Sequence, residues 1–126
     1  MDLNFPSVYV VILNYNHQAD LQETIESFEN QNYPNLEIVV SDNGSTDYSI
    51  EWLRANKPNV HLIENGENLG WAQGNNVGID YALKQDAYYI LLANNDLWFD
   101  SPSVISQLVQ SCRFECIDIV GPKQMY

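Results

Sequence analysis

The stretch Tyr88–Phe99, YYILLANNDLWF, decides the fold that this 126-residue chain predicts. It begins as an apolar run of strand length, stops at Asn94, Asn95 and Asp96, and is apolar again from Leu97 onward. A turn that leaves a sheet for solvent should not resume an apolar pattern at once. The stretch therefore predicts a buried strand, 87–93, that presents polar side chains at the edge of a sheet.

Four more strands and four helices are expected around this one. The strands are Val8–Leu13, Glu37–Ser41, Val60–Glu64 and Ile117–Val120. The helices cover about 19–30, Asp47–Ala55 and Trp71–Lys84, and a last one opens with Ser101 as N-cap and Pro102 at its first position. Apolar strands alternating with helices predict an α/β fold, a doubly wound and mainly parallel sheet with helices on both faces.

Composition and charge favour one domain, 1–126, with little affinity for nucleic acid. The chain has seventeen acidic residues and only five Lys and Arg, which gives a net charge of −12. The five basic residues are scattered, so no patch could neutralise a run of nucleic-acid phosphates. A phosphorylated ligand would need another source of positive charge, which points to a divalent cation, Mg²⁺ or Mn²⁺, on carboxylate oxygens.

The chain has no segment that predicts secretion or a membrane span. Its longest apolar runs are far shorter than the roughly 20 residues of a membrane helix. The N-terminal MDLNFPS contains no basic residue, unlike a signal peptide. Cys112 and Cys116 are four residues apart, as expected of two free thiols one helical turn apart, so a cytoplasmic location is expected.

Polar residues follow four of the predicted strands, at the edge where such sheets bind ligands. Asn14 and Asn16 follow the first strand, Asp42 the second, and 65–70 the third. Any one of these loops is explained by ordinary turn chemistry, but four at one edge are not. A nucleotide-binding P-loop and a dinucleotide-binding GxGxxG motif after the first strand are both missing, which disfavours those two classes.

Four motifs together resemble the nucleotide-sugar-binding half of family 2 glycosyltransferases, which have the GT-A fold. They are VYVVILNYN, IVVSDNGSTD, IENGENLGWAQGNNVGI and YYILLANND, in the family's order and across about 8–122. The likeness is greatest to a branch resembling bacterial rhamnosyltransferases, whose fourth strand often ends in Asn-Pro-Asp. Asn95 in the middle departs both from that form and from the commoner Asp-x-Asp.

The resemblance implies a site for a nucleotide-sugar donor. Asp96 would hold the metal ion, because one carboxylate with substrate phosphates and water is a normal Mg²⁺ arrangement. Asp42 would accept a hydrogen bond from N3–H of uracil or thymine, which cytosine lacks. The remaining residues expected to bind the donor are Leu13, Asn14, Asn16, Gly70, Gly74, Asn75, Asn76, Asn94 and Asn95.

Structural alternatives exist for several of these residues. Asp42 could instead hold an Asx turn, and Gly74 could equally serve helix packing. His17 is expected at the surface without a ligand role. Trp71 and Trp98 could stack on a ligand, although core packing is the expected fate of both.

The implied reaction is transfer of a hexosyl or rhamnosyl unit from a UDP- or dTDP-sugar to an acceptor hydroxyl, with inversion. The acceptor would be a glycan or lipid-linked molecule in bacterial polysaccharide or cell-surface glycan synthesis, at the inner membrane face in a longer protein. The catalytic base is expected beyond residue 126, so the chain is interpreted as a donor-binding part that lacks the acceptor half.

Two rival functions remain open from the sequence. The first is a nucleotide-binding module without catalytic activity. It stays possible because Asn-Asn-Asp has a single aspartate where the commoner Asp-x-Asp has one more carboxylate. The second is a signalling receiver domain, which matches in length and acidity. It is disfavoured because Asn14 and Asn16 stand where such a domain needs an acidic pair, and Glu64 where it needs an aspartate.

Overall fold

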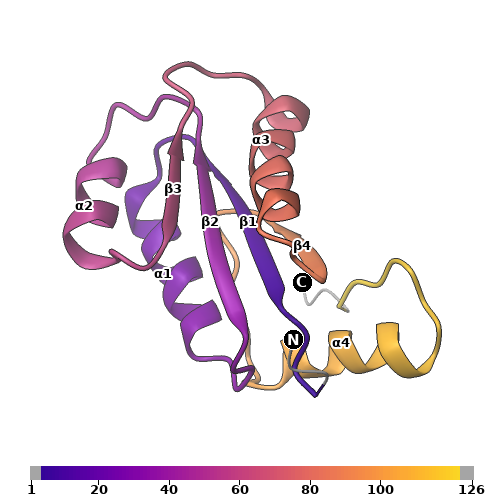
Figure 1. Cartoon of the computed structure of the whole chain (residues 1–126). Coiled ribbons are helices and arrows are strands. Elements are labelled where there is room, and N and C mark those ends of the chain that lie inside the picture. Colours follow the sequence, from indigo (N-terminus) through magenta and orange to yellow (C-terminus); the bar gives the residue numbers. More distant parts are fainter. Residues whose placement is uncertain (1–3, 123–126) are drawn as a thin grey trace.

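The computed structural model describes residues 4–122 and contains four strands and four helices within them (Figure 1). In chain order these are β1 Val8–Asn14, α1 Gln18–Glu29, β2 Leu36–Asp42, α2 Ser49–Asn56, β3 His61–Glu64, α3 Trp71–Lys84, β4 Tyr89–Ala93 and α4 Val104–Phe114. Four of the five predicted strands and all four predicted helices are present, with ends that differ by up to three residues.

The four strands form one sheet in the order β3-β2-β1-β4, and every neighbouring pair is parallel. β2 lies on one side of β1, and β4 lies on the other, so the strand order reverses at β1. The predicted doubly wound α/β fold is therefore confirmed. In such a sheet the ligand crevice is expected at the carboxyl ends of β1 and β4.

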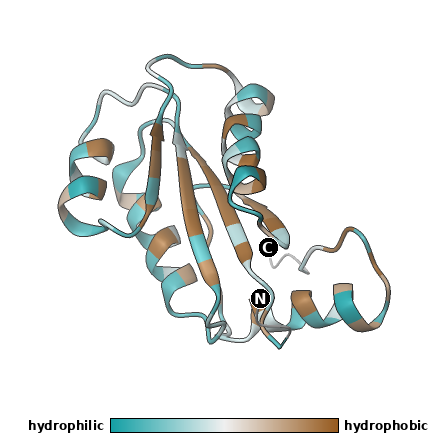
Figure 2. Cartoon of the chain, viewed as in Figure 1, coloured by the Kyte–Doolittle hydropathy of each residue, from teal (hydrophilic) through white to brown (hydrophobic). Residues whose placement is uncertain are grey.

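Helices cover both faces of the sheet. Alternate residues of β1, among them Val10 and Ile12, are fully buried against the stripe Leu21, Ile25 and Phe28 of α1. Leu53 of α2 and the α4 residues Ile105 and Val109 join the same core. Among the described helices, α3 is the one that covers the other face (Figure 1). The strands are mostly apolar, and the helices mix polar and apolar residues (Figure 2).

Two glycines allow α3 to approach β1 closely. A Cβ atom on Gly78 would lie 2.3 Å from Cγ1 of Val11, and one on Gly74 would lie 2.5 Å from Cδ1 of Leu13. Both distances are too short for packed carbon atoms. The spacing of four residues places these glycines on one side of the helix, so they set its distance from the sheet.

The predicted strand Ile117–Val120 is wrong, because this segment forms no strand in the structure. Ile119 is 91% exposed and none of the four residues is fully buried, so the segment lacks the burial that a strand beside β4 would have. Cys116 lies beyond the end of α4 in a left-handed conformation (φ 54°). The expectation that the two free cysteines share one helix is therefore wrong.

The predicted start of the last helix is also wrong. Pro102 lies in a turn before α4, and its carbonyl accepts a hydrogen bond from the backbone of Asn32 at 2.8 Å. The side chain of Gln31 then bridges to α4, accepting from the N–H of Ile105 at 3.1 Å and donating to the carbonyl of Ser101 at 2.7 Å. A distant glutamine, instead of a local N-cap, satisfies the start of the helix.

Candidate functional site

An open cleft of about 320 Å³ lies at the carboxyl ends of β1 and β4. This is the crevice that the reversal of strand order predicts. Residues that follow β1, β2, β3 and β4 all contribute to its walls. They are Leu13, Tyr15, His17, Asn43, Asn68, Gly70, Trp71, Asn94, Asn95 and Asp96.

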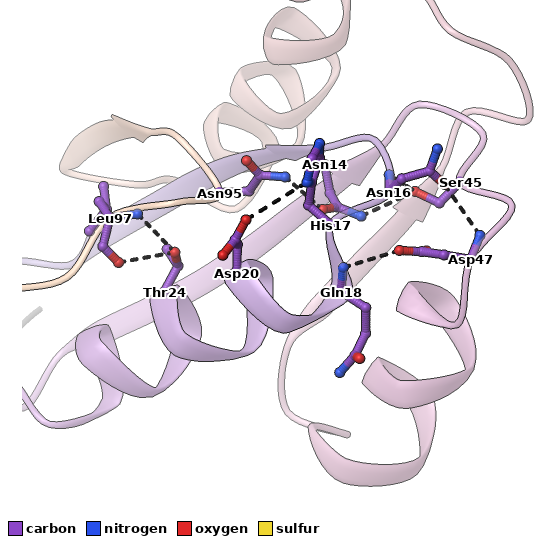
Figure 3. Close-up of polar contacts among 10 residues, drawn as sticks. All are labelled: Asn14, Asn16, His17, Gln18, Asp20, Thr24, Ser45, Asp47, Asn95 and Leu97. Atoms are coloured by element: carbon purple, nitrogen blue, oxygen red, sulfur yellow. Dashed lines mark hydrogen bonds and ion pairs between the residues drawn. The ribbon is translucent and has the colours of Figure 1, made fainter.

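Asn14, at the end of β1, joins the ends of three strands beneath this cleft. Its side chain is fully buried. The amide oxygen accepts from Nδ2 of Asn95 at 3.0 Å (Figure 3). The amide nitrogen donates to Oγ of Ser45 at 3.1 Å and to Oδ1 of Asp42 at 3.0 Å. The loops after β1, β2 and β4 are therefore held together through one amide group.

Asp42 uses both carboxylate oxygens inside the protein. Oδ1 accepts from Asn14 and from the hydroxyl of Ser45 at 2.6 Å, and Oδ2 accepts from the backbone N–H groups of Gly44 at 3.1 Å and Ser45 at 2.8 Å. All partners are donors, and the residue is fully buried. The geometry is that of the Asx turn, and Asp42 is not among the residues that line the cleft.

Two successive residues after β1 have left-handed backbone conformations. These are Asn16 (φ 60°) and His17 (φ 59°), an uncommon conformation for residues other than glycine. The loop after β2 holds them. Oγ of Ser45 accepts from the N–H of Asn16 at 2.8 Å (Figure 3), and Oδ1 of Asn16 accepts from the N–H of Thr46 at 2.9 Å. Hydrogen bonds from outside the loop thus offset its backbone strain.

Asp47, just before α2, connects the loop after β2 to the start of α1. Its carboxylate accepts from the N–H of Gln18 at 3.0 Å and from that of Ser49 at 2.9 Å. Burial of the side chain acts to raise its pKa, but the hydrogen bonds from Ser49 and Gln18 together outweigh burial, so the pKa of Asp47 is lowered.

The turn 94–96 is tied down on both sides. Asn94 and Asp96 are exposed, whereas Asn95 is partly buried and donates to Asn14. Beyond the turn, the hydroxyl of Thr24 both accepts from the N–H of Leu97 and donates to its carbonyl, each at 3.0 Å. Phe99 then packs edge-on against Phe28 at 5.0 Å between ring centroids. The apolar pattern resumes here because the chain continues along α1.

The structure brings five of the predicted site residues together on the cleft wall, and the other six lie elsewhere. The five are Leu13, Gly70, Asn94, Asn95 and Asp96. Asn14 and Asp42 are buried beneath the cleft, and Asn16 lies in the loop beside it. In α3, Gly74 packs on β1, Asn75 is buried and donates to the carbonyl of Trp71, and Asn76 is exposed away from the cleft lining. Donor contact by any of the eleven stays a prediction.

Five cleft residues were not assigned to the site from the sequence: Tyr15, His17, Asn43, Asn68 and Trp71. The expectation of core packing is wrong for both Trp71 and Trp98, which are 65% and 71% exposed. A usable signal for Tyr15, Asn43 and Asn68 is their place in loops that follow β1, β2 and β3. Asn43 donates to the carbonyl of Gly70 at 3.1 Å and accepts from Asn65 at 2.9 Å, which orients its amide at the cleft wall.

The charges around the cleft suit a metal-bound phosphate better than a free one. Neither Lys nor Arg is among the described residues that line it, and Asp96 is its single carboxylate. Residues 4–122 contain no group of three or more His, Cys, Asp or Glu placed to hold a metal ion. A divalent cation at this cleft would therefore have one protein carboxylate, that of Asp96, and would have to take most of its ligands from phosphate and water.

Sequence comparison places the chain among glycosyltransferases. The family described as "Glycosyl transferase family 2" matches residues 9–126. An uncharacterised glycosyltransferase of Haemophilus influenzae is 37% identical over 79 residues, or 60% of this chain and 24% of that protein. The dTDP-rhamnosyl transferase RfbF of Shigella flexneri is 34% identical over 91 residues, or 71% and 29%. The matched residues thus span 24% and 29% of the lengths of these two relatives.

Solved structures share the fold. A mannosyltransferase from Pyrobaculum calidifontis, in complex with GDP-Man and Mn²⁺, superposes with a TM-score of 0.77 at 24% identity, over 86% of this chain and 32% of that one. TarS of S. aureus in complex with UDP-GlcNAc gives 0.72 at 19% identity, over 94% and 37%. No helix in the described part of this chain is both long and apolar enough to cross a membrane.

Proposed function

This chain belongs to glycosyl transferase family 2, and from that premise we propose that it binds the UDP- or dTDP-sugar donor of a glycosyl transfer in the cleft between the ends of β1 and β4. The observation that carries the proposal is the meeting of four strand-end loops at one cleft, in the family's sequence order. Membership in the family removes the receiver-domain alternative.

The donor's diphosphate is proposed to lie beside Asp96 and Asn94. A divalent cation held there would offset the phosphate charge that no cleft Lys or Arg offsets, and would stabilise the departing nucleoside diphosphate. The Mn²⁺ in the Pyrobaculum mannosyltransferase complex supports this choice of cofactor. Asp96 supplies the charged ligand, and Asn94 supplies a neutral oxygen beside it.

For the nucleobase, the proposal favours Asn43 over the expected Asp42. Both oxygens of Asp42 already accept two hydrogen bonds each in the Asx turn. Asn43 is only 2% exposed but lines the cleft, and among the described residues its amide oxygen accepts from Asn65 alone, which leaves a second lone pair. That lone pair could accept from N3–H of uracil or thymine, which agrees with a UDP- or dTDP-linked donor.

The finer parts of the proposal concern the whole enzyme. The likeness to a dTDP-rhamnosyl transferase supports a rhamnosyl, or more broadly a hexosyl, donor. We extend the proposal to bacterial polysaccharide or surface-glycan synthesis in the cytoplasm. Inverting transfer needs a base on the acceptor hydroxyl, and no residue of this chain is assigned that role. Residues 1–126 alone are thus proposed to bind donor but to transfer sugar slowly or not at all.

Calorimetric titration of the chain with UDP and dTDP, with and without Mn²⁺, tests the donor site. Mn²⁺ should tighten binding of both nucleotides, and Asp96→Ala should remove at least about tenfold of that gain because it removes the charged ligand. Asp100→Ala is the matched control, since it removes the same charge from an exposed position outside the cleft lining. The proposal is contradicted if Mn²⁺ does not change the nucleotide affinity. It is also contradicted if Asp96→Ala and Asp100→Ala show the same effect of Mn²⁺ on that affinity.

A nucleotide-binding module without catalytic activity is the second candidate, because the cleft offers only one carboxylate. It predicts the same titration result. The distinction is made on a longer protein that contains this chain: release of UDP or dTDP from a sugar donor in the presence of acceptor supports the transferase and contradicts the inactive module.

A further inference from the structure

We propose that Asn95 is a positioning residue that holds the metal-binding turn through Asn14 and the buried Asp42, without itself binding the donor. The inference rests on the proposed function, because it concerns how Asp96 and Asn94 are presented to a metal-bound diphosphate. It assigns a purpose to the middle residue of Asn-Asn-Asp, which departs from the forms that the family resemblance leads one to expect.

The orientation of each amide follows from the buried carboxylate. The oxygens of Asp42 can only accept, so the amide nitrogen of Asn14 must face Asp42, where it also reaches Ser45. The amide oxygen of Asn14 then faces the cleft side, and only a donor can satisfy it. Asn95 supplies that donor at 3.0 Å. The hydrogen bonds therefore run in one direction, from Asn95 through Asn14 to Asp42.

The exposure of the turn residues divides their tasks. Asn94 and Asp96 are exposed at the cleft, while the residue between them is partly buried with its side chain on Asn14. The next backbone tether is at Leu97, which Thr24 holds on α1. Asn95 is thus the side chain by which the turn itself is fixed to the end of the sheet, and its anchorage limits how far Asp96 can move from the cleft.

This arrangement leads to an unexpected prediction for the Asn95→Asp variant. A count of metal ligands predicts that a second carboxylate in the turn strengthens Mn²⁺ binding. Positioning predicts the reverse: the new carboxylate would face the amide oxygen of Asn14, and Asn14 cannot turn over without losing its bonds to Asp42 and Ser45. The turn would be pushed away from its anchor.

The test measures UDP binding to the 126-residue chain by calorimetry with and without Mn²⁺, and takes the ratio of the two dissociation constants as the Mn²⁺ enhancement. For Asn95→Ala we expect the enhancement to fall by about tenfold, the usual scale for a residue that orients a metal ligand. Binding of UDP without metal should stay within about twofold. Asn95→Asp should lower the enhancement at least as much.

The control variant is Asn56→Ala, which removes an exposed asparagine whose amide donates to the carbonyl of Trp52 at 3.0 Å, on α2. It should keep the enhancement of the wild type. If Asn95→Ala does not fold, the isosteric Asn95→Asp carries the test alone. An unchanged enhancement in the Asn95 variants, or a raised one in Asn95→Asp, overturns the inference while the donor site stands. A wild-type chain without any enhancement overturns both.

Discussion

Gly78 on α3 lies directly against Val11 on β1, at a distance that leaves no room for a side-chain carbon atom: a Cβ built on Gly78 would be 2.3 Å from Cγ1 of Val11. Val11 is fully buried in the middle of the sheet, and its branched side chain has little freedom to turn. The contact fixes the height of α3 above the strand that leads to Asn14.

Gly78→Ala should therefore destabilise the fold in spite of alanine's better helix propensity. The overlap with Val11 should cost about 1–3 kcal/mol, and the propensity gain offsets up to about 1 kcal/mol of this. Urea unfolding followed by circular dichroism measures the net loss. A variant as stable as the wild type would show that α3 can move away from the sheet at no cost.

Gly74→Ala should act on the cleft as well as on stability. Its Cβ would lie 2.5 Å from Leu13 and 3.0 Å from the amide atoms of Asn43, and both of these residues line the cleft. We expect weaker UDP binding, by about tenfold if one hydrogen bond to the base is lost. Gly78→Ala is the packing control, because it crowds the same helix without touching a cleft residue. Equal UDP affinity in the two variants would contradict this prediction.

Thr24→Val should cost more than the loss of one surface hydroxyl. The hydroxyl of Thr24 serves both the N–H and the carbonyl of Leu97, and valine of the same shape would leave both without a partner. Buried groups left in this way cost about 1–3 kcal/mol. Thermal and urea unfolding should show that loss for Thr24→Val and a smaller one for Thr24→Ser, which keeps the hydroxyl. The reverse order would mean that the methyl group matters more.

Asp47→Asn should reduce stability in a manner that depends on pH. The folded-state pKa of Asp47 is lowered from 3.8 by hydrogen bonds that outweigh burial, so the charged form is favoured in the folded protein. Its contribution is complete above about pH 3.8 and is lost as pH falls through the lower folded-state pKa. The variant should be less stable by about 1 kcal/mol near neutral pH, and the difference should shrink in acid. A difference that does not change with pH would exclude the charge as its cause.

The sequence predicted all four strands of the sheet because each contains a short apolar stretch followed by turn residues. Val8–Asn14 shows why this works: it is buried on both faces, so its identity follows from composition alone. The segment Ile117–Val120 has a similar composition but none of its residues is fully buried, and composition cannot distinguish the two cases. The start of α4 was missed because its cap comes from Gln31, which is distant in the sequence.

For the site, the sequence predicted that the strand-end loops lie at one edge of the sheet, but it could not say which of their side chains line the cleft. Asp42 and Asn43 are neighbours in one loop, and only the structure shows that the first is enclosed by four donors while the second reaches the cleft. Trp71 is a similar case, since an aromatic residue at a helix start has the same pattern whether it is buried or exposed. Such choices depend on long-range contacts that local patterns do not encode.

The absence of Lys and Arg from the described cleft wall has a consequence for the kinetics of donor capture. A free nucleoside diphosphate is negatively charged, so it is repelled by the electrostatic field of a chain of net charge −12. Added salt shortens the range of that field, from about 10 Å at 0.1 M to about 3 Å at 1 M. The association rate of the free nucleotide should thus rise as salt is added, whereas it would fall for a site lined with lysines. Prior complexation with Mg²⁺ should likewise speed its entry.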